Sequence, residues 1–513
     1  MDEQMPHGEA TELVAALVKA FLPTGQIASW IGDAPFAGKG EMVHLHDPAT
    51  GLPLISYHDG GIESVEAAMT AARKAQPTWM ALTASQRGRV MWRIGQLVRD
   101  NADVLAELET RTAGKPIRDT RVEVMRVAEM FEYYAGWCDK LTGEVIPVPS
   151  SHLNYTRREP FGTVVQITPW NAPIFTAGWQ IAPAICAGNA AVLKPSEFTP
   201  ITSVALGKLC VEAGAPPGLV NVIAGIGRTA GSAAVGHPQT GLVVFVGSPE
   251  TGAAIAAQAA RNVVPCILEL GGKSANIVFA DADLDHAVLG TQAAIFSGAG
   301  QSCVAGSRLL VQESVHDRFV EQLAAAAAKI PVGQPLSETT QIGPISNARQ
   351  WAVIDGFVQR SVKGGGRLAT GGGKPAAFKD NKGFFYAPTV IANVGADAEI
   401  AQEEVFGPVL AAIPFKDEAE AIGIANATRF GLAGAVWTKD VARAHRVAAA
   451  IRAGTVWINS YKTINVMSPF GGFGRSGHGR SSGYDALMAY TQSKSIWVET
   501  AANPAVSFGY APE

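Results

Sequence analysis

Hydrophobic residues recur at helical spacing through residues 62–138 of the chain. One run of apolar side chains spaced three or four residues apart is Val65, Ala68, Met69 and Ala72. This period places apolar side chains on one face of a helix, so we predict a helical region here. Residues 1–60 are poorly patterned, and we expect an irregular N-terminal arm there with one helix near residues 11–21.

Between residues 162 and 272, short β-branched segments alternate with alanine-rich ones. The predicted strands are 163–168, 190–193, 219–223, 242–246 and 265–270. The predicted helices follow Pro173 and span 201–213, 229–235 and 250–260. This alternation indicates a parallel sheet covered by helices on both faces. Ligands of such sheets bind beyond the carboxyl ends of the strands, so the segments after these strands should share one rim.

A second alternating block, from about 275 to 480, predicts another α/β domain. Its expected strands are 277–279, 308–312 and 409–414, and its expected helices are 319–328 and 419–426. Residues 141–160 differ, because their spaced prolines and β-branched residues favour an extended hairpin or arm outside a helical core. The tail, 485–513, contains a segment at 495–499 that is suited to an added strand.

Composition narrows the class of protein. The chain has 513 residues, too many for one core, so we expect two or three domains. Its net charge is -4 and it has no basic run, which argues against nucleic acid or a membrane surface as a partner. The five cysteines form no CxxC pair, so neither a disulfide framework nor a metal site is predicted. With no evident signal peptide or bilayer-spanning stretch, we expect a soluble, cytoplasmic protein.

Cys303 lies in a run of small residues, with Gly300 and Gly306 three positions before and after it. Little side-chain bulk stands near the sulfur, and glycines allow the backbone to approach a ligand closely. An exposed thiol in such a loop is suited to act as a nucleophile. The alternative is that Cys303 is a small buried hydrophobe, as most free cysteines are.

Two more side chains are suited to carbonyl chemistry. Glu269 lies between two leucines and precedes two glycines, so we expect partial burial, which raises a carboxyl pKa toward the range of a general base. Asn171 follows a Pro-Trp pair and offers amide N–H donors to a developing oxyanion. It is equally suited to cap the helix that begins near Pro173.

Residues beyond other predicted strand ends fit a dinucleotide. Gly225, Gly227 and Gly231 resemble a glycine-rich fingerprint, but their spacing is not GxGxxG and an ordinary turn is the alternative. Ser248 precedes a helix whose free N–H groups fit a phosphate oxygen. Glu197 can accept hydrogen bonds from ribose hydroxyls and would repel a 2′-phosphate, so we favour NAD and leave NADP open.

Seven stretches together resemble the aldehyde dehydrogenase superfamily. They are Pro-Trp-Asn at 169–171, Lys-Pro-Ser-Glu at 194–197, Phe-Val-Gly-Ser at 245–248, Leu-Glu-Leu-Gly-Gly-Lys at 268–273, Gly-Gln-Ser-Cys at 300–303, Glu-Glu-Val-Phe-Gly-Pro at 403–408 and Pro-Phe-Gly-Gly at 469–472. The resemblance implies an α/β fold with three parts. They are a Rossmann-like parallel-sheet NAD-binding domain (1–140 and 161–270), a catalytic α/β domain (271–480) and a β oligomerisation arm (141–160 and 485–513). It also implies a homodimer or homotetramer in which the arm extends a neighbour's sheet.

The resemblance further implies oxidation of an aldehyde to its acid with NAD+ or NADP+. Cys303 would attack the aldehyde to form a thiohemiacetal, Asn171 would hold the oxyanion, and Glu269 would activate water against the resulting thioester. The implied cofactor-binding residues are Ile167, Trp170, Lys194, Glu197, Gly227, Gly231, Phe245, Gly247, Ser248, Leu270, Gly271, Glu403 and Phe406. The implied substrate-binding residues are Ala172, Phe175, Trp179, Phe296, Ser297, Ser302, Ile464 and Phe470.

Four positions depart from the family pattern. Gln180 and Ser481 stand where many members carry a lysine and a glutamate near the general base. We therefore expect the proton of Glu269 to leave through water or backbone carbonyls. Ala172 and Ser297 stand where members that act on small aldehydes often carry aromatics, which predicts a substrate larger than acetaldehyde, such as an aromatic or medium-chain one.

Three other functions remain as alternatives. A CoA-acylating relative would pass the acyl group to CoA, but the chain retains Glu269 and has Trp170 where that relative usually has phenylalanine. A non-catalytic ligand-binding protein of the same fold would not need the intact set of Cys303, Glu269 and Asn171. A thiol hydrolase would pair its cysteine with a histidine, and no histidine lies near these motifs.

Overall fold

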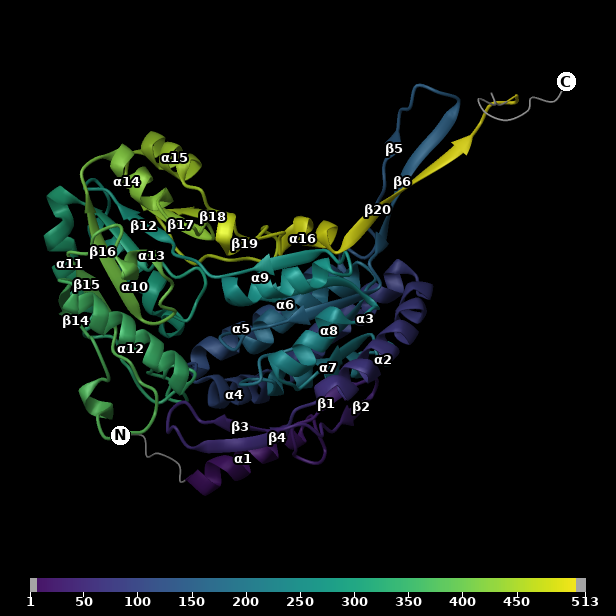
Figure 1. The fold of residues 1–513 in the computed structure, drawn as a ribbon, viewed down its shortest axis with the longest axis horizontal. Coiled ribbons are helices and arrows are strands. Elements are labelled where there is room, and N and C mark those ends of the chain that lie inside the picture. Colours follow the sequence, from purple (N-terminus) through teal and green to yellow (C-terminus); the bar gives the residue numbers. More distant parts are fainter. Residues whose placement is uncertain (1–6, 504–513) are drawn as a thin grey trace.

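The computed structural model describes residues 7–503, and residues 1–6 and 504–513, the outer ends of the predicted first domain and of the predicted arm, lie outside it. Figure 1 shows two α/β lobes beside each other and a slender β arm that projects away from them. The aldehyde dehydrogenase-like α/β fold expected from the motifs is thus accompanied by the expected arm. No helix between residues 7 and 503 has both the length and the apolar character that crossing a membrane requires.

The first lobe contains an eight-stranded sheet of order β19-β11-β10-β7-β8-β9-β1-β2. Its strands are β1 (Ser29–Ile31), β2 (Ala34–Phe36), β7 (Thr163–Ile167), β8 (Ala190–Lys194), β9 (Val220–Val222), β10 (Thr240–Val246), β11 (Cys266–Glu269) and β19 (Gly477–His478). The central strands from β11 to β9 run parallel, as the alternating pattern predicts. Strands β7 and β8 are buried along their whole length, which is typical of a sheet covered on both faces.

Helices surround this sheet, and the region 62–138 is helical as predicted. The helices of the lobe are α1 (His7–Lys19), α2 (Gly61–Ala81), α3 (Ala84–Asp100), α4 (Ala102–Ala113), α5 (Ile117–Ala135), α6 (Pro173–Cys186), α7 (Ile201–Glu212), α8 (Ser232–Gly236), α9 (Pro249–Ala260) and α16 (Gly483–Ala489). The segment predicted as a helix at 229–235 begins instead as a π-helical turn, η1 (Gly227–Gly231), before α8.

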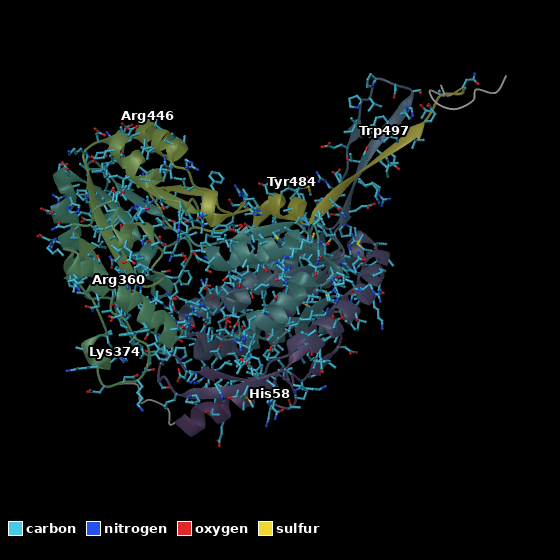
Figure 2. All side chains as sticks on the ribbon, viewed as in Figure 1. His58, Arg360, Lys374, Arg446, Tyr484 and Trp497 are labelled. Carbon is cyan, nitrogen blue, oxygen red and sulfur yellow. The ribbon has the colours of Figure 1, made fainter. Side chains whose placement is uncertain are left out.

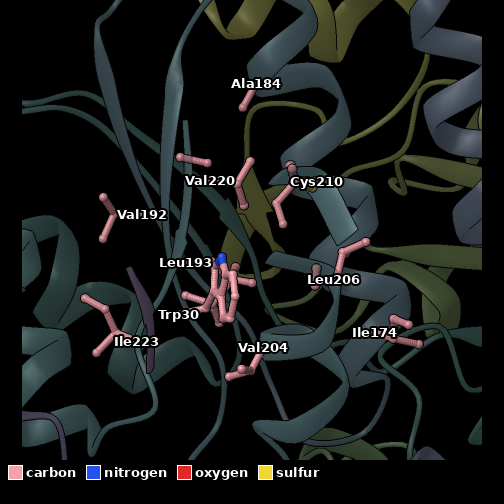
Figure 3. Close-up of a cluster of buried hydrophobic side chains, with 14 of the residues drawn as sticks. Trp30, Ile174, Ala184, Val192, Leu193, Val204, Leu206, Cys210, Val220 and Ile223 are labelled. Carbon is pink, nitrogen blue, oxygen red and sulfur yellow. The ribbon is translucent and has the colours of Figure 1, made fainter. Parts of the chain in front are cut away.

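The expectation of an irregular arm at residues 1–60 is wrong. Beyond α1, this region forms β1 and β2 of the main sheet and a separate hairpin of β3 (Met42–His46) and β4 (Pro53–His58). Trp30 of β1 pairs with Val222 of β9, and Figure 3 shows its ring among the buried side chains of the first lobe, including Leu193 and Val204. A strand of three residues is too short to show a period, so its burial depends on contacts distant in the sequence.

The second lobe contains a seven-stranded sheet of order β14-β15-β16-β13-β12-β17-β18. Its strands are β12 (Ala275–Val278), β13 (Arg308–Gln312), β14 (Arg367–Thr370), β15 (Thr389–Ala392), β16 (Val409–Phe415), β17 (Ala433–Trp437) and β18 (Thr455–Ile458). Its helices are α10 (Leu284–Phe296), α11 (Glu313–Ala327), α12 (Ala348–Lys363), α13 (Glu399–Gln402), α14 (Glu418–Asn426) and α15 (Val441–Ala450). The strands predicted at 277–279, 308–312 and 409–414 correspond to β12, β13 and β16.

The arm is a three-stranded sheet of order β20-β6-β5. It joins β5 (Val145–Ile146) and β6 (His152–Pro160) to β20 (Thr491–Glu499), which pairs with β6 along its whole length. The predicted hairpin and the predicted added strand near the C-terminus are therefore confirmed. Figure 2 shows Trp497 of β20 on this arm, well away from both lobes.

Candidate active site

The parallel strands of the first sheet end at one rim. Lys194 and Glu269 are the last residues of β8 and β11, and Asn171 and Ser248 follow β7 and β10. Because neighbouring parallel strands end on the same side, these four side chains gather at that rim. The cysteine loop of the second lobe comes to the same place, because a Cβ on Gly272 would lie only 2.4 Å from the Cys303 carbonyl oxygen.

The cysteine loop leaves α10 through a tight turn, η2 (Ser297–Gly300). Gly298, Ala299 and Gly300 all have left-handed backbone angles, with φ values of 65, 55 and 68°. A Cβ on Gly300 would lie 2.0 Å from the carbonyl oxygen of Gly407, so only glycine fits there. Ala299 is an uncommon alanine in this conformation, which persists only where the surroundings fix it. The loop is thus held against the segment around 407 and presents Cys303 at the rim.

The Cys303 thiol is partly buried, and its surroundings hold it in the protonated form. Burial raises the pKa of Cys303 to about 12, and the negative charges of Glu404 and Glu269 raise it as well. Lys462 acts in the opposite direction and lowers this pKa. Both carboxylates are therefore close enough to the sulfur to influence its ionisation, and activation of the thiol requires positive charge or a base nearby.

Glu269 is 4% exposed, and burial raises its pKa to about 8. The Ser481 hydroxyl donates a 2.8 Å hydrogen bond to Glu269 Oε1 and lowers this pKa, whereas Oε2 has no hydrogen-bond partner within residues 7–503. The short strand β19 pairs with β11 beside Glu269 and so brings the segment that carries Ser481 to the carboxylate. A buried carboxyl with this pKa is suited to act as a general base at neutral to alkaline pH.

Asn171 faces the cysteine loop, since its Nδ2 donates a 2.8 Å hydrogen bond to the Gln301 carbonyl. It does not cap α6: the cap residue is Ala172, and no side chain caps that helix. The Lys115 ammonium holds the Asn171 backbone by donating a 3.0 Å hydrogen bond to its carbonyl. An amide NH2 carries two donors: one N–H of Asn171 fixes the side chain, and the other makes no hydrogen bond to residues 7–503 and can donate to an oxyanion.

Several of the predicted cofactor residues lie at or just beyond the ends of the strands that form this rim. Lys194 Nζ contacts Glu197 Oε2 at 3.1 Å, and the glycines of η1 pass beside Lys194 without side chains. The Ser248 hydroxyl caps the 12-residue helix α9 by accepting a hydrogen bond from the Thr251 N–H. An ammonium, a carboxylate, bare backbone and a helix N-terminus fit the ribose and phosphates of a dinucleotide.

Apolar and aromatic side chains complete this rim. Ile167, Phe245 and Leu270 are buried beneath the rim, and a Cβ on Gly247 would lie 2.4 Å from the ring of Phe245. At the end toward the cysteine, the rings of Trp170 and Phe406 meet edge to face at 5.4 Å.

The predicted cofactor residue Glu403 does not face the site. Its carboxylate pairs with Arg429 at 2.6 Å on the surface, and its side chain is 41% exposed. Its neighbour Glu404 faces the cysteine loop instead: it accepts a 3.0 Å hydrogen bond from the Gly272 N–H, and a Cβ on Gly271 would touch its Oε2. The two acids are adjacent in one motif, and only the backbone of this loop determines which of them faces inward.

Seven of the eight predicted substrate residues divide into two groups, and Phe296 belongs to neither. Phe175 and Trp179 of α6 meet edge to face at 4.7 Å, and Trp179 meets Phe470 at 5.2 Å. Phe175, Trp179 and Ile464 line a cavity of about 470 Å³ between α5, α6 and residues 464–466. Ala172, Ser297 and Ser302 are at least partly accessible near the cysteine loop. Phe296 does not line this cavity, because its ring is 2% exposed and packs in the core of the second lobe.

Comparisons with known proteins agree with this geometry. The sequence model described as "Aldehyde dehydrogenase family" matches residues 36–496. The chain is 42% identical to betaine aldehyde dehydrogenase of Bacillus subtilis, over 90% of this chain and 95% of that protein. It is 42% identical to human retinal dehydrogenase 2, over 90% and 89% of the two chains. A solved structure of betaine aldehyde dehydrogenase from Staphylococcus aureus, in complex with NAD+, aligns with a TM-score of 0.92 at 36% identity, covering 98% of this chain and 99% of that one.

Proposed function

Because the chain belongs to the aldehyde dehydrogenase family, we propose that Cys303, Glu269 and Asn171 are the catalytic residues of its oxidation of an aldehyde to the carboxylic acid. The observation that carries this proposal is the convergence of three distant segments. Gly272, just after Glu269, packs on the Cys303 carbonyl, and Asn171 bonds to the Gln301 carbonyl two residues before the sulfur. These contacts support a site in which a nucleophile, a buried acid and an amide donor act on one carbonyl group.

In the first half of the reaction, the Cys303 thiolate attacks the aldehyde carbon and forms a thiohemiacetal. The second N–H of Asn171 and the backbone N–H of Cys303 stabilise the negative charge on oxygen. When bound, NAD+ supplies the hydride acceptor for the substrate carbon. Loss of hydride from that carbon leaves a thioester on Cys303.

In the second half, Glu269 removes a proton from water, which attacks the thioester carbon. The acid leaves and the cysteine sulfur regains a proton. Because the pKa of Glu269 is about 8, the ionised fraction of this carboxyl increases as the pH rises toward and past this value. The ionised form is the one that acts as a base. The hydrogen bond from Ser481 favours the ionised form.

NAD+ is the proposed cofactor, supported by solved relatives that contain it. Lys194 and Glu197 would hold the adenine ribose, Ser248 and the start of α9 the pyrophosphate, and Trp170 and Phe406 would lie near the nicotinamide. Glu197 disfavours a 2′-phosphate, which supports NAD+ over NADP+. Glu404, which faces the cysteine loop, would hold the nicotinamide ribose in place of the outward-facing Glu403.

The proposed substrate is larger than acetaldehyde. Small side chains at Ala172 and Ser297 leave room beside the cysteine loop, and the cavity of about 470 Å³ lies at the end of the aromatic cluster. An aromatic or medium-chain aldehyde would place its apolar part against Phe175, Trp179 and Phe470. The burial of that part would supply binding free energy in proportion to its area.

We also propose that the arm joins copies of the chain into a homodimer or homotetramer. Strand β20, of nine residues, is the edge strand of the arm, and its outer side has no partner strand within residues 7–503; Trp497 and Val498 on it are 57% and 42% exposed. A long edge with exposed apolar side chains is suited to extend a neighbour's sheet.

The test of this function is NADH formation across neutral aldehydes of graded size. The wild type should form NADH and free acid without CoA, and Cys303→Ala should form neither. Cys266→Ala, at a half-buried cysteine of β11, is the matched control and should retain activity. Activity retained by Cys303→Ala, or acyl transfer that requires CoA, would refute the proposal.

A further inference from the structure

Lys462 contacts the cysteine loop and stands two residues before Ile464, which lines the cavity. Its Nζ lies 3.2 Å from the Ser297 carbonyl oxygen and 3.5 Å from the Ser297 hydroxyl. Its backbone is left-handed, with φ of 58°, which is uncommon for a lysine. Such a conformation persists where the surrounding structure fixes it, so the position of this ammonium near the site is part of the fold.

This ammonium has no counter-charge in direct contact. No carboxylate of residues 7–503 forms an ion pair with Lys462: the nearby Asp119 contacts Arg118 at 3.4 Å, and Glu123 contacts Lys115 at 2.5 Å. Burial lowers the pKa of Lys462 to about 8, although its electrostatic interactions with Cys303 and Asp119 oppose this shift. A cation that is partly buried beside neutral oxygens alone is stabilised less than in water, and an anion beside it would restore that stabilisation.

The other charges at the cavity balance one another. The charged residues that line it are Arg121, Arg126 and Glu129. Arg121 pairs with Glu338 at 2.6 Å. The other two, Arg126 and Glu129, carry one positive and one negative charge. Lys462 therefore adds a positive charge to this side of the site, and it is close enough to Cys303 for each to shift the pKa of the other.

We propose that Lys462 makes the enzyme select aldehydes that carry a second, anionic group, such as a terminal carboxylate, over neutral and cationic aldehydes of similar size. This inference rests on the proposed function, since it assigns the substrate class of the same site. The substrate carboxylate would accept charge-assisted hydrogen bonds from the ammonium, whereas a cationic substrate would meet a like charge. The rings of Trp179 and Phe470 are suited to a cation, so a cationic substrate is the opposite outcome of the test.

The experiment compares kcat/KM for three aldehydes with a short chain: 4-oxobutanoate, which is anionic, butanal, which is neutral, and betaine aldehyde, which is cationic. The wild type should favour 4-oxobutanoate over butanal and butanal over betaine aldehyde. Lys462→Met keeps the length of the side chain and removes its charge, and it should reduce the ratio of 4-oxobutanoate to butanal about tenfold, the size expected for one charged hydrogen bond. Lys462→Arg should retain the preference, and Lys439→Met, at an exposed lysine outside the site, should not change it.

The ratio also has a pH dependence with a definite sign. The ammonium is protonated below its pKa of about 8, so the preference for 4-oxobutanoate should be present at neutral pH and fall as the pH rises past that value. The groups that act on Lys462 are Asp119, Lys115 and Cys303. Titration of Cys303 and Glu269 affects both substrates and cancels in the ratio.

A wild type that favours butanal or betaine aldehyde, or a ratio that Lys462→Met leaves within about twofold of the wild type, would overturn the inference while leaving the proposed function intact. No NADH from the three aldehydes or from the larger neutral aldehydes of the graded screen would instead overturn the proposed function, and the inference with it.

Discussion

The Ser481 hydroxyl donates a 2.8 Å hydrogen bond to Glu269 Oε1. Many members of the family carry a glutamate where this chain has Ser481. The bond is made because β19 pairs with β11 in register, with Gly477 opposite Glu269. A carboxyl that is otherwise desolvated therefore receives one donor that favours its ionised form. A second acid at this position would repel the carboxylate instead.

Removal of that hydrogen bond should shift the pH dependence of acid release. Burial raises the pKa of Glu269 to about 8, and Ser481 lowers it from a still higher value. In Ser481→Ala the pKa of Glu269 should rise, so the limb of kcat that increases with pH should move to higher pH. Ser482→Ala is the control, because the Ser482 hydroxyl donates to the Ser468 carbonyl and not to Glu269. A limb at the same pH in Ser481→Ala would contradict this role.

Gln180 supports the expectation that water carries the proton away from Glu269. Its side chain is 2% exposed, and neither Oε1 nor Nε2 has a hydrogen-bond partner within the described chain. Gln166, whose Nε2 donates to the Gln180 carbonyl at 2.7 Å, also has an unpaired buried Oε1. Buried amides are rarely left without partners, and internal water usually fills that role.

Placing at positions 180 and 481 the lysine and glutamate that many family members carry should change the route by which the proton leaves Glu269. Gln180→Lys alone should lower the pKa of Glu269 and destabilise the fold, because it buries an ammonium with little compensation. Adding Ser481→Glu should recover part of the lost stability, measured as Tm, and should alter the rate or pH profile of acid release. An unchanged rate and an unchanged profile in the double variant would count against proton exit through water in the wild type.

The adjacent acids Glu403 and Glu404 should differ sharply in effect. Glu404→Gln removes the charge that most raises the pKa of Cys303, so that pKa should fall and alkylation of the thiol should become faster at neutral pH. NAD+ binding should weaken too, because the proposed contact with the ribose is lost. Glu403→Gln breaks only an exposed pair with Arg429 and should leave both measurements within about twofold. The reverse ranking would restore Glu403 as the cofactor residue.

The sequence was a sufficient guide where one local pattern determined the outcome. Strands β7 and β8 are short, largely apolar segments in an alternating block, so the parallel sheet could be predicted, and the resemblance of the motifs to one family implied that Cys303, Glu269 and Asn171 converge. The sequence is an insufficient guide where the direction of the backbone determines which of two adjacent side chains faces the site. The same short motif contains an outward Glu403 and an inward Glu404, and the ring of Phe296 packs in the core although the next residue, Ser297, is exposed. The sequence alone shows that Lys462 carries a positive charge. That no carboxylate pairs with it follows from the fold, which places Asp119 against Arg118 and Glu123 against Lys115.

Filling the space at Ser297 tests the predicted substrate size. The Ser297 side chain is exposed at the start of η2, so a ring can be placed there without displacing a packed core. In Ser297→Phe the kcat/KM for benzaldehyde should fall about tenfold relative to that for acetaldehyde, a difference within the range of steric discrimination in apolar pockets. Ser297→Ala, which adds no bulk, is the control. An unchanged ratio would show that this position does not limit substrate size.

The arm should control the assembly of the protein. Trp497 is 57% exposed on the free edge strand β20, although its ring meets that of His152 edge to face at 5.7 Å. A charge at this position cannot be buried against a neighbour without a partner, so Trp497→Asp should shift the mass measured by light scattering toward the monomer. The fold should be retained, because the ring contributes to neither core. Val441→Asp, at a valine of α15 that is 71% exposed, is the matched control and should keep the wild-type mass. A wild-type mass for Trp497→Asp would mean that the copies associate through another surface.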